Sequence, residues 1–283
     1  MSMRENLISI KLNIMQRTVI STPNRTVGPF SAPFMLCFYN TTLDAFTLGL
    51  LMGVTSTESL SLWVWDANLG NPVREKAALT FGQDGNLVLA DADGRIAWQT
   101  NTANKGVTGF KLLPNGNLVL HDSKVKFIWQ SFDHPTNTML VGQSLRLKGP
   151  TKLVSRASDG VKKNGAYSFV LEPERLALYY KSQNSPNPYL YYDWRDVYGP
   201  LEVKFYSEPE TYEGYAYDIN LEYQGTGSTG AVFLNRPKYN ATLSFLRLWP
   251  DGNLRVHTFY QHVMWGAWEE TFHSLLKRFN VGK

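Results

Sequence analysis

A stretch of 17 residues occurs twice in this chain, 31 positions apart and without a gap. The first copy is DGNLVLADADGRIAWQT (Asp84–Thr100) and the second is NGNLVLHDSKVKFIWQS (Asn115–Ser131). In each copy a tryptophan, Trp98 or Trp129, stands 14 positions after the first residue. A unit this small cannot bury its apolar face alone, so repeated units pack against one another. The repeat therefore predicts several similar units around a shared core.

Two weaker copies flank this pair. Upstream, WVWDAN (Trp63–Asn68) resembles the end of the first copy, so Trp65 is expected to match Trp98. This gives three units between about Phe34 and Ser131. Downstream, DGNLRVHTFYQHVMW ends on Trp265, again 14 positions after its first residue. We expect this segment to be a further unit.

The pattern within each unit indicates β structure. Leu87 and Leu89 are expected on one face of a strand, since side chains alternate along it. The opposite face would carry Asn86, Val88 and Ala90. Asp91–Gly94 then supplies a hairpin turn. At the same turn the second copy has Val125, which is less suited to a positive φ.

Composition suits a folded protein without a nucleic-acid partner or a membrane span. Of 283 residues, 43% are hydrophobic and 18% are charged, whereas disordered chains are more charged and less aromatic. The net charge of +4 is scattered and forms no basic stripe of the kind that binds nucleic acid. The most apolar run, Phe46–Val54, is too short to span a bilayer, so no transmembrane segment is predicted.

Signals for the cellular compartment conflict. Arg4, Lys11 and Arg17 interrupt any apolar core of a signal peptide, and the isoleucines from Ile8 onward alternate as in a short strand. Three Asn-x-Ser/Thr sequons are weak support for secretion. These glycosylation candidates are Asn24, Asn40 and Asn240.

We predict no enzyme, no cofactor and no metal site. The five histidines lack metal-ligand spacing to cysteines or carboxylates. Cys37 lies in the apolar run FMLCFYNTT, which favours a buried, inert thiol over a nucleophile or a thiol that pairs with another chain. Nothing in the sequence brings Asp84 and Asp251 to the spacing that glycoside hydrolysis requires. No glycine-rich phosphate loop is present, because GNL continues as a strand.

The aromatic residues of Tyr179–Trp194 leave two interpretations open. Exposed rings would stack on sugars, and buried rings would form the core of a second domain. The sequence favours the core.

Three segments together closely resemble a known family: WVWDANLGNPV, DGNLVLADADGRIAWQTNT and IWQSFDHPTNTMLVGQSL. They resemble the bulb-type mannose-binding lectin domain of plants, in the version of the S-locus glycoproteins and especially the epidermis-specific secreted glycoproteins. The resemblance covers about Phe30 to Trp268. It implies the β-prism II fold, with three four-stranded sheets about a pseudo-threefold axis and the repeated tryptophans at the centre. It also implies a second lectin-like domain in tandem and an extracellular or cell-wall location.

We therefore expect five segments. They are an N-terminal segment (1–29), a bulb-type lectin domain (30–148), a linker rich in Gly, Lys and Ser (149–165), a second lectin-like domain (166–268) and a tail (269–283). The tail is expected to hold a short helix, since Phe272, Leu275, Leu276 and Phe279 have helical spacing. Family members begin with a signal peptide and many continue into a cysteine-rich module, so the chain resembles a truncated member.

Mannose-binding members of the family use Gln-x-Asp-x-Asn-x-Val-x-Tyr on one strand, where period two puts all five side chains on one face. This chain keeps the motif only in part. The retained carbohydrate-binding candidates are Asp84, Asn86 and Val88, then Asn115, Asn117 and Val119, then Asp251 and Asn253. The Gln and Tyr positions hold Gly82 and Ala90, Leu113 and His121, and Trp249 and His257, and Arg255 replaces the third Val.

We expect a non-enzymatic, lectin-like extracellular glycoprotein with degenerate mannose-type motifs. Its partners would be mannose-type glycans or cell-wall and surface glycoproteins, bound weakly. The alternative is a structural or protein-interaction module without sugar binding, related to S-domain receptor ectodomains. A third interpretation is a fragment without a stable function. In the last two cases the retained motif residues serve only the turn and the start of the strand.

Overall fold

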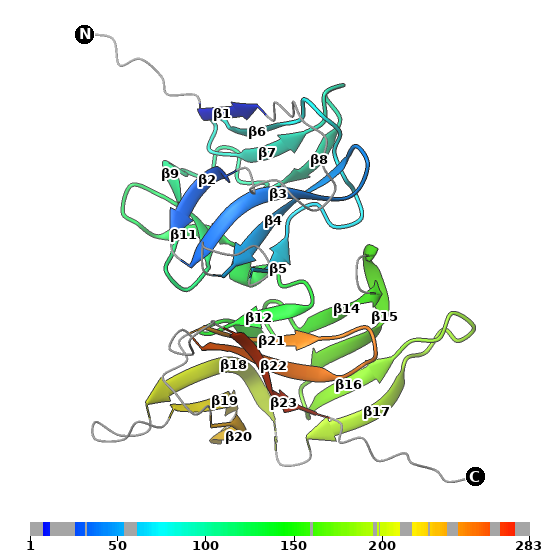
Figure 1. The fold of residues 1–283 in the computed structure, drawn as a ribbon. Coiled ribbons are helices and arrows are strands. Elements are labelled where there is room, and N and C mark those ends of the chain that lie inside the picture. Colours follow the sequence, from blue (N-terminus) through cyan, green and yellow to red (C-terminus); the bar gives the residue numbers. More distant parts are fainter. Residues whose placement is uncertain are drawn as a thin grey trace. The chain divides into compact units, whose positions relative to one another are not determined.

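The computed structural model describes residues 8–11, 26–31, 33–53, 61–158, 161–194, 197, 199–209, 217–225, 227–236, 243–260 and 267–274. Their secondary structure is β strand, with one 3-10 turn, η2 (Ser131–Asp133). The predicted all-β class is confirmed. The chain divides into two compact units, Met1–Ser131 and Phe132–Lys283 (Figure 1). The expected limits of the two lectin domains stay predictions.

The first unit contains three antiparallel sheets, each built on three strands consecutive in the sequence. One joins β6 (Ala78–Phe81), β7 (Leu87–Ala90) and β8 (Ile96–Gln99), with β1 (Ile8–Lys11) beside β6. Another joins β3 (Phe34–Thr42), β4 (Ala45–Met52) and β5 (Leu62–Asp66), with β2 (Thr26–Ser31) beside β3. The third joins β9 (Gly109–Leu112), β10 (Leu118–His121) and β11 (Phe127–Gln130). The two gapless repeats therefore lie in different sheets.

Each of these three sheets contributes one tryptophan to a shared cluster. Trp65 lies on β5, Trp98 on β8 and Trp129 on β11. Their ring centroids are 6.0, 6.3 and 5.8 Å apart, and every pair meets edge to face. This is the arrangement that aromatic quadrupoles favour. The packing of the repeated tryptophans is confirmed, and Trp65 is the third equivalent.

The second unit contains three four-stranded sheets that are also built on consecutive triplets. The triplets are β15 (Val161–Leu171), β16 (Leu176–Tyr180) and β17 (Tyr189–Trp194); β18 (Pro200–Pro209), β19 (Tyr217–Gly225) and β20 (Thr229–Asn235); and β21 (Ser244–Leu248), β22 (Leu254–Tyr260) and β23 (Ala267–His273). Three short strands come first: β12 (Thr138–Leu140), β13 (Ser144–Arg146) and β14 (Lys152–Ser158). They pair with β21, β18 and β15 respectively, so one stretch completes all three sheets.

Inward-facing residues of the three sheets form the core of the second unit. Its largest fully buried side chains include Phe169 and Phe205, and Met139 and Leu145 reach the same cluster from the short strands. Area removed from water by such apolar side chains is the main stabilising contribution to a fold of this kind.

The expected linker over 149–165 is wrong. This segment contains β14 and the start of β15. Leu153 and Ser155 are fully buried and alternate with an exposed Lys152 and a half-buried Val154. The lysines and serines that suggested a linker belong to an amphipathic strand, whose period-two pattern the composition hides.

The expected helical tail is wrong for the part that the structure describes. Residues 269–273 belong to β23, where Phe272 packs against the core of the second unit. The apolar spacing that suggested a helix spans the end of this strand. Residues 275–283 lie outside the described part of the chain.

The turn between β10 and β11 carries a strained residue. Val125 has φ of 64°, and Gly94 has φ of 86° at the matching position of the β7–β8 turn. The left-handed region suits glycine and disfavours β-branched residues. The side chain of Val125 is 61% exposed, so it gains little burial in return.

We expect Val125→Gly to raise the free energy of unfolding by about 0.5–1 kcal/mol, because relief of left-handed strain exceeds the entropy that glycine adds to the unfolded chain. Urea denaturation measures the change. The matched control is Gly94→Val, which should destabilise by a similar amount, since a Cβ there meets nothing within 4 Å and only φ is at issue. A neutral or destabilising Val125→Gly would contradict the strain.

Candidate functional site

Each copy of the mannose-type motif begins with a residue that caps its own turn. Its side-chain oxygen accepts the N–H two residues later in the pairs Asp84–Asn86 (3.0 Å), Asn115–Asn117 (3.2 Å) and Asp251–Asn253 (3.0 Å). The glycine between the two residues has a positive φ at Gly85, Gly116 and Gly252. These are Asx-turns, which Asp and Asn form with their own backbone. The first motif residue therefore has a local structural role in all three copies.

Asn86 is buried and ties the base of its own hairpin. Its Nδ2 donates to Oε1 of Gln99 at 2.9 Å. Its Oδ1 accepts from the hydroxyl of Thr100 at 3.0 Å and from the N–H of Thr102 at 3.1 Å. The Thr100 hydroxyl in turn accepts the N–H of Leu87 at 3.1 Å. We call this set of bonds the asparagine clip.

The clip recurs in the other copies. Asn117 donates to Gln130 at 2.8 Å and accepts from the hydroxyl of Ser131 at 3.2 Å. In the second unit Asn253 accepts from the hydroxyl of Ser274 at 3.2 Å. Sequence reasoning missed these partners, although the shared Trp-Gln-Thr/Ser ending of the two repeats was a usable signal. The side-chain amides of Asn86 and Asn117 therefore make their hydrogen bonds within the protein.

The clip also corrects the assignment of Trp265. Asn86 and Thr100 are 14 positions apart, whereas Asn253 and Ser274 are 21 apart, so the β22–β23 hairpin is longer. Strand register pairs Val256 with Phe272 where the first repeat pairs Leu89 with Trp98. Phe272 therefore takes the place of the repeat tryptophan. Trp265 lies outside the described residues, and its 14-residue spacing is wrong as a sign of equivalence.

The first two motif faces differ from each other. On the first, the side chain of Asp84 is exposed and Val88 is half-buried, while Gly82 and Ala90 offer no polar group at the flanking positions. On the second, Val119 is only 1% exposed. The ring of His121 packs over Gly109, and its Nδ1 lies 2.9 Å from the carbonyl oxygen of Asp122.

The third motif face is covered by its own side chains. Arg255, which replaces the family's valine, donates to Asp251 at 2.5 Å and lies 3.1 Å from Glu270. Its guanidinium stands 5.7 Å from the centroid of Trp249. The Asp251 carboxylate is thereby paired within the sheet, and Arg255 crosses the strip where a sugar would lie.

His257 stands at the tyrosine position of the same face. Its ring stacks on Phe245, with centroids 5.2 Å apart and planes 9° from parallel. Burial, together with the positive charges of Arg247 and Arg255, lowers its pKa to about 4. His257 is therefore neutral near pH 7 and supplies no cation to a ligand.

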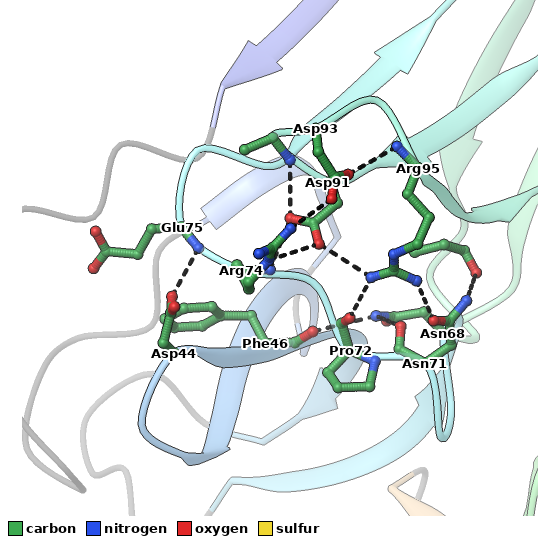
Figure 2. Close-up of polar contacts among 12 residues, drawn as sticks. Asp44, Phe46, Asn68, Asn71, Pro72, Arg74, Glu75, Asp91, Asp93 and Arg95 are labelled. Carbon is green, nitrogen blue, oxygen red and sulfur yellow. Dashed lines mark hydrogen bonds and ion pairs between the residues drawn. The ribbon is translucent and has the colours of Figure 1, made fainter.

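A charged cluster joins the β7–β8 turn to the loop before β6 (Figure 2). The Asp91 carboxylate, 1% exposed, lies 3.1 Å from both Arg74 and Arg95. Burial raises its pKa, but N–H donation from Ala92 and Arg74 and the two guanidinium groups outweigh it, and the pKa falls to about 2. Each of these donors to the Asp91 carboxylate comes from the loop before β6 or from the β7–β8 turn. The cluster fastens the two segments and leaves the carboxylate no capacity for acid–base chemistry near neutral pH.

Asn68 and Asn71 connect the charged cluster to β4 through further hydrogen bonds, as Figure 2 shows. Asn68, 2% exposed, accepts the N–H of Leu48 at 2.7 Å and donates to the carbonyl oxygens of Phe46 and Asn71 at 3.2 and 2.9 Å. Arg95 donates to the side chain of Asn71. Sequence reasoning did not single out these asparagines, because a buried amide in a loop has no periodic signature.

The thiol of Cys37 is buried on β3, and burial raises its pKa to about 12. A thiol with this pKa is protonated and unreactive near neutrality, as the sequence predicted. In the ranges that the structure describes, no three His, Cys, Asp or Glu side chains gather as metal ligands would.

Of the three sequons, only Asn40 lies in the described part of the chain. It is exposed near the end of β3. Asn24 and Asn240 fall outside the described residues.

We expect Asn86→Ala to lower the free energy of unfolding by about 2–3 kcal/mol, since three hydrogen bonds are lost and partners at the half-buried Gln99 and the buried Thr102 are left unsatisfied. Chemical denaturation checks this. Asp84→Ala is the matched control, because it removes one exposed cap and should cost no more than about 1 kcal/mol. Equal losses for the two variants would rule out the clip as the main role of Asn86.

The Asp91 cluster predicts acid sensitivity. The folded pKa, about 2, lies below the ordinary 3.8, so the stabilisation is complete above about pH 4 and declines as the pH falls toward 2. Asp91→Asn should flatten the dependence of unfolding free energy on pH in this window and lower stability at pH 7. Asp93→Asn, at the exposed edge of the cluster, is the control. An unchanged slope in Asp91→Asn would show that other carboxylates govern acid unfolding.

Comparison with known proteins agrees with the resemblance in the sequence. Residues 62–158 match the family described as D-mannose binding lectin. The epidermis-specific secreted glycoprotein EP1 of Daucus carota is 56% identical over 261 residues, which cover 89% of this chain and 67% of that protein. EP1-like glycoprotein 4 of Arabidopsis thaliana is 52% identical over 86% of this chain and 56% of its own length. The S-locus-specific glycoprotein BS29-1 of Brassica oleracea var. alboglabra is 34% identical over 62% of this chain and 43% of its own.

The chain thus spans between 43% and 67% of the length of these three relatives. Among the described residues no helix is long and apolar enough to cross a membrane. The match with the carrot glycoprotein covers most of both chains at an identity well above that of chance similarity. The chain belongs to the family of the epidermis-specific secreted glycoprotein EP1, and its residues 62–158 match the D-mannose binding lectin domain.

Proposed function

We propose that this protein is a non-enzymatic, lectin-like extracellular glycoprotein whose mannose-type motifs no longer form working sugar sites. We also propose that its two units are lectin domains of the β-prism II type in tandem. The shared plan supports this: in both units three consecutive triplets of strands form three sheets. Earlier strands extend two of these sheets in the first unit and all three in the second. The tryptophan cluster of the first unit fits a pseudo-threefold centre.

The observation that carries the proposal is the asparagine clip. Asn86 and Asn117 direct their amides to Gln99 and Gln130 of their own hairpins. A shallow sugar site depends on a few hydrogen bonds, so every polar anchor counts. The first face also lacks two anchors, because Gly82 and Ala90 stand at the Gln and Tyr positions.

Extracellular location is supported from two directions. The carrot relative is named a secreted glycoprotein. In this chain the sequon asparagine Asn40 is exposed, as an acceptor of an N-linked glycan must be. Weak contacts with glycans or with cell-wall and surface glycoproteins are the function we favour, and protein interaction without sugar binding is the alternative class.

Restoring the missing anchors tests the proposal. The double variant Gly82→Gln with Ala90→Tyr should bind mannose about 5- to 150-fold more tightly than the native chain, the range for two regained hydrogen bonds. A Cβ at position 82 would lie 2.5 Å from Oδ1 of Asp84, so that carboxylate must move to make room for it. Titration of mannose against purified protein, followed by NMR, gives both affinities.

The control is Gly82→Gln with Ala90→Phe, which lacks only the phenolic hydroxyl and should recover less affinity. On a glycan array the native chain should show no mannose binding at micromolar affinity. Micromolar binding by the native chain, lost in Asp84→Ala, would defeat the proposal of degenerate motifs.

A further inference from the structure

A row of tyrosines crosses the sheet of β14–β17 in the second unit. Strand register places Tyr167 of β15 opposite Tyr180 of β16, and Tyr180 opposite Tyr189 of β17. Residues paired in this way lie on the same face of an antiparallel sheet. The three rings thus form a ladder across three strands, which we call the tyrosine ladder.

The ladder runs from the interior to the surface. Tyr167 is half-buried, Tyr180 is 38% exposed and Tyr189 is 69% exposed. The rings of Tyr167 and Tyr180 are 5.1 Å apart. Farther along the same strands, Trp194 and Tyr192 pack against the core. The aromatic segment that the sequence left between two interpretations therefore serves both: one end is core and the other faces solvent.

The buried end of the ladder is held rigidly. Tyr191 meets Tyr167 edge to face at 5.8 Å, and its hydroxyl donates to the carbonyl oxygen of Gly252 at 2.5 Å. Gly252 has φ of 81°, and a Cβ there would come within 2.6 Å of the Tyr167 ring. Only glycine fits this contact, so the turn between β21 and β22 packs directly against the Tyr167 end of the ladder. The fixed ring of Tyr167 supports Tyr180, whose ring therefore loses less entropy when a ligand stacks on it.

We propose that the tyrosine ladder binds neutral, β-linked pyranose chains by stacking. This inference rests on the proposed lectin-like function and names the surface that performs it. Pyranoses with equatorial hydroxyls have two apolar faces, which match the faces of aromatic rings. Adjacent strands are about 4.8 Å apart, close to the advance of one residue in an extended β-linked chain. Successive sugars would therefore meet Tyr180 and Tyr189.

The surrounding polar groups favour a neutral sugar. The Asp251 carboxylate, 53% exposed, precedes the glycine on which the ladder rests, and it shares Arg255 with Glu270. Two carboxylates on one guanidinium keep a net negative charge, which would repel the carboxylates of uronic acids. Among the described residues, neither the Tyr180 nor the Tyr189 hydroxyl bonds to another protein group, so both are available to sugar hydroxyls. Two exposed rings are a small area for a stable protein interface, which needs about 800 Å² on each partner.

Cellohexaose, a neutral β-linked glucose oligomer, is the probe, with trigalacturonic acid as the acidic comparison. Saturation-transfer NMR and titration against the full chain measure contact and affinity. We expect cellohexaose to bind and trigalacturonic acid to bind more weakly. Tyr180→Ala with Tyr189→Ala should lower the affinity for cellohexaose by about 10-fold or more, at roughly 3-fold or more for each lost ring. The phenylalanine pair at the same positions should keep most of it.

Phe233→Ala is the matched control, because Phe233 is an aromatic residue 57% exposed on β20 of a different sheet. It should bind cellohexaose like the native chain. Thermal unfolding of each variant verifies that the fold is kept. The inference is overturned if the native chain does not bind cellohexaose, if the alanine pair binds it equally well, or if trigalacturonic acid binds more tightly.

Self-association provides a further outcome that would overturn the inference. A second copy seated on the ladder would appear in sedimentation as a dimer that the alanine pair abolishes. The mannose-restoration variants change the first unit only, so failure of the proposed function and failure of the tyrosine ladder can be told apart.

Discussion

A side-chain amide removed from water must find partners within the protein, and this requirement closes both gapless repeats of the first unit. Asn86 begins one strand, while Gln99 and Thr100 end the strand that returns beside it. The hairpin is tied at its base by side chains as well as by the backbone ladder. Trp98 directly precedes Gln99, so the tie also fixes where the tryptophan enters the central cluster. Sheet closure and core packing therefore depend on the same few bonds.

This arrangement explains how a sugar-binding motif can persist without its sugar. Glycine, asparagine and leucine at the start of each strand meet demands of the fold: a positive φ, a buried amide and a core contact. Their presence alone does not indicate a ligand. The positions of the two missing anchors are the informative ones, and here they hold Gly82 and Ala90. Ligand recognition has to be sought on other surfaces of the same scaffold.

Local patterns in the sequence predicted much of the fold, and contacts between distant elements limited the rest. The repeat and its alternation led to the β class, the turns and the cluster of Trp65 with its two equivalents. The predicted linker over 149–165 was wrong because its lysine-rich composition hid the strand β14, which becomes stable only when it pairs with β15. The predicted equivalence of Trp265 with the repeat tryptophans was wrong because spacing along the chain cannot show that a hairpin has lengthened. For the motif, sequence identified the residues, but only the structure reveals that Asn86 turns inward.

Residues 138–158 leave the ribosome before every strand with which they pair. β14 meets β15 almost at once, whereas β13 waits for β18, and Thr138 of β12 finally lies opposite Arg247. Pairings across longer loops form later, because more chain entropy is lost on closure. The three sheets are therefore completed by these short strands in the order in which their partner strands are synthesised. During that interval the unpaired strand β12 is the edge most in need of protection from other nascent chains.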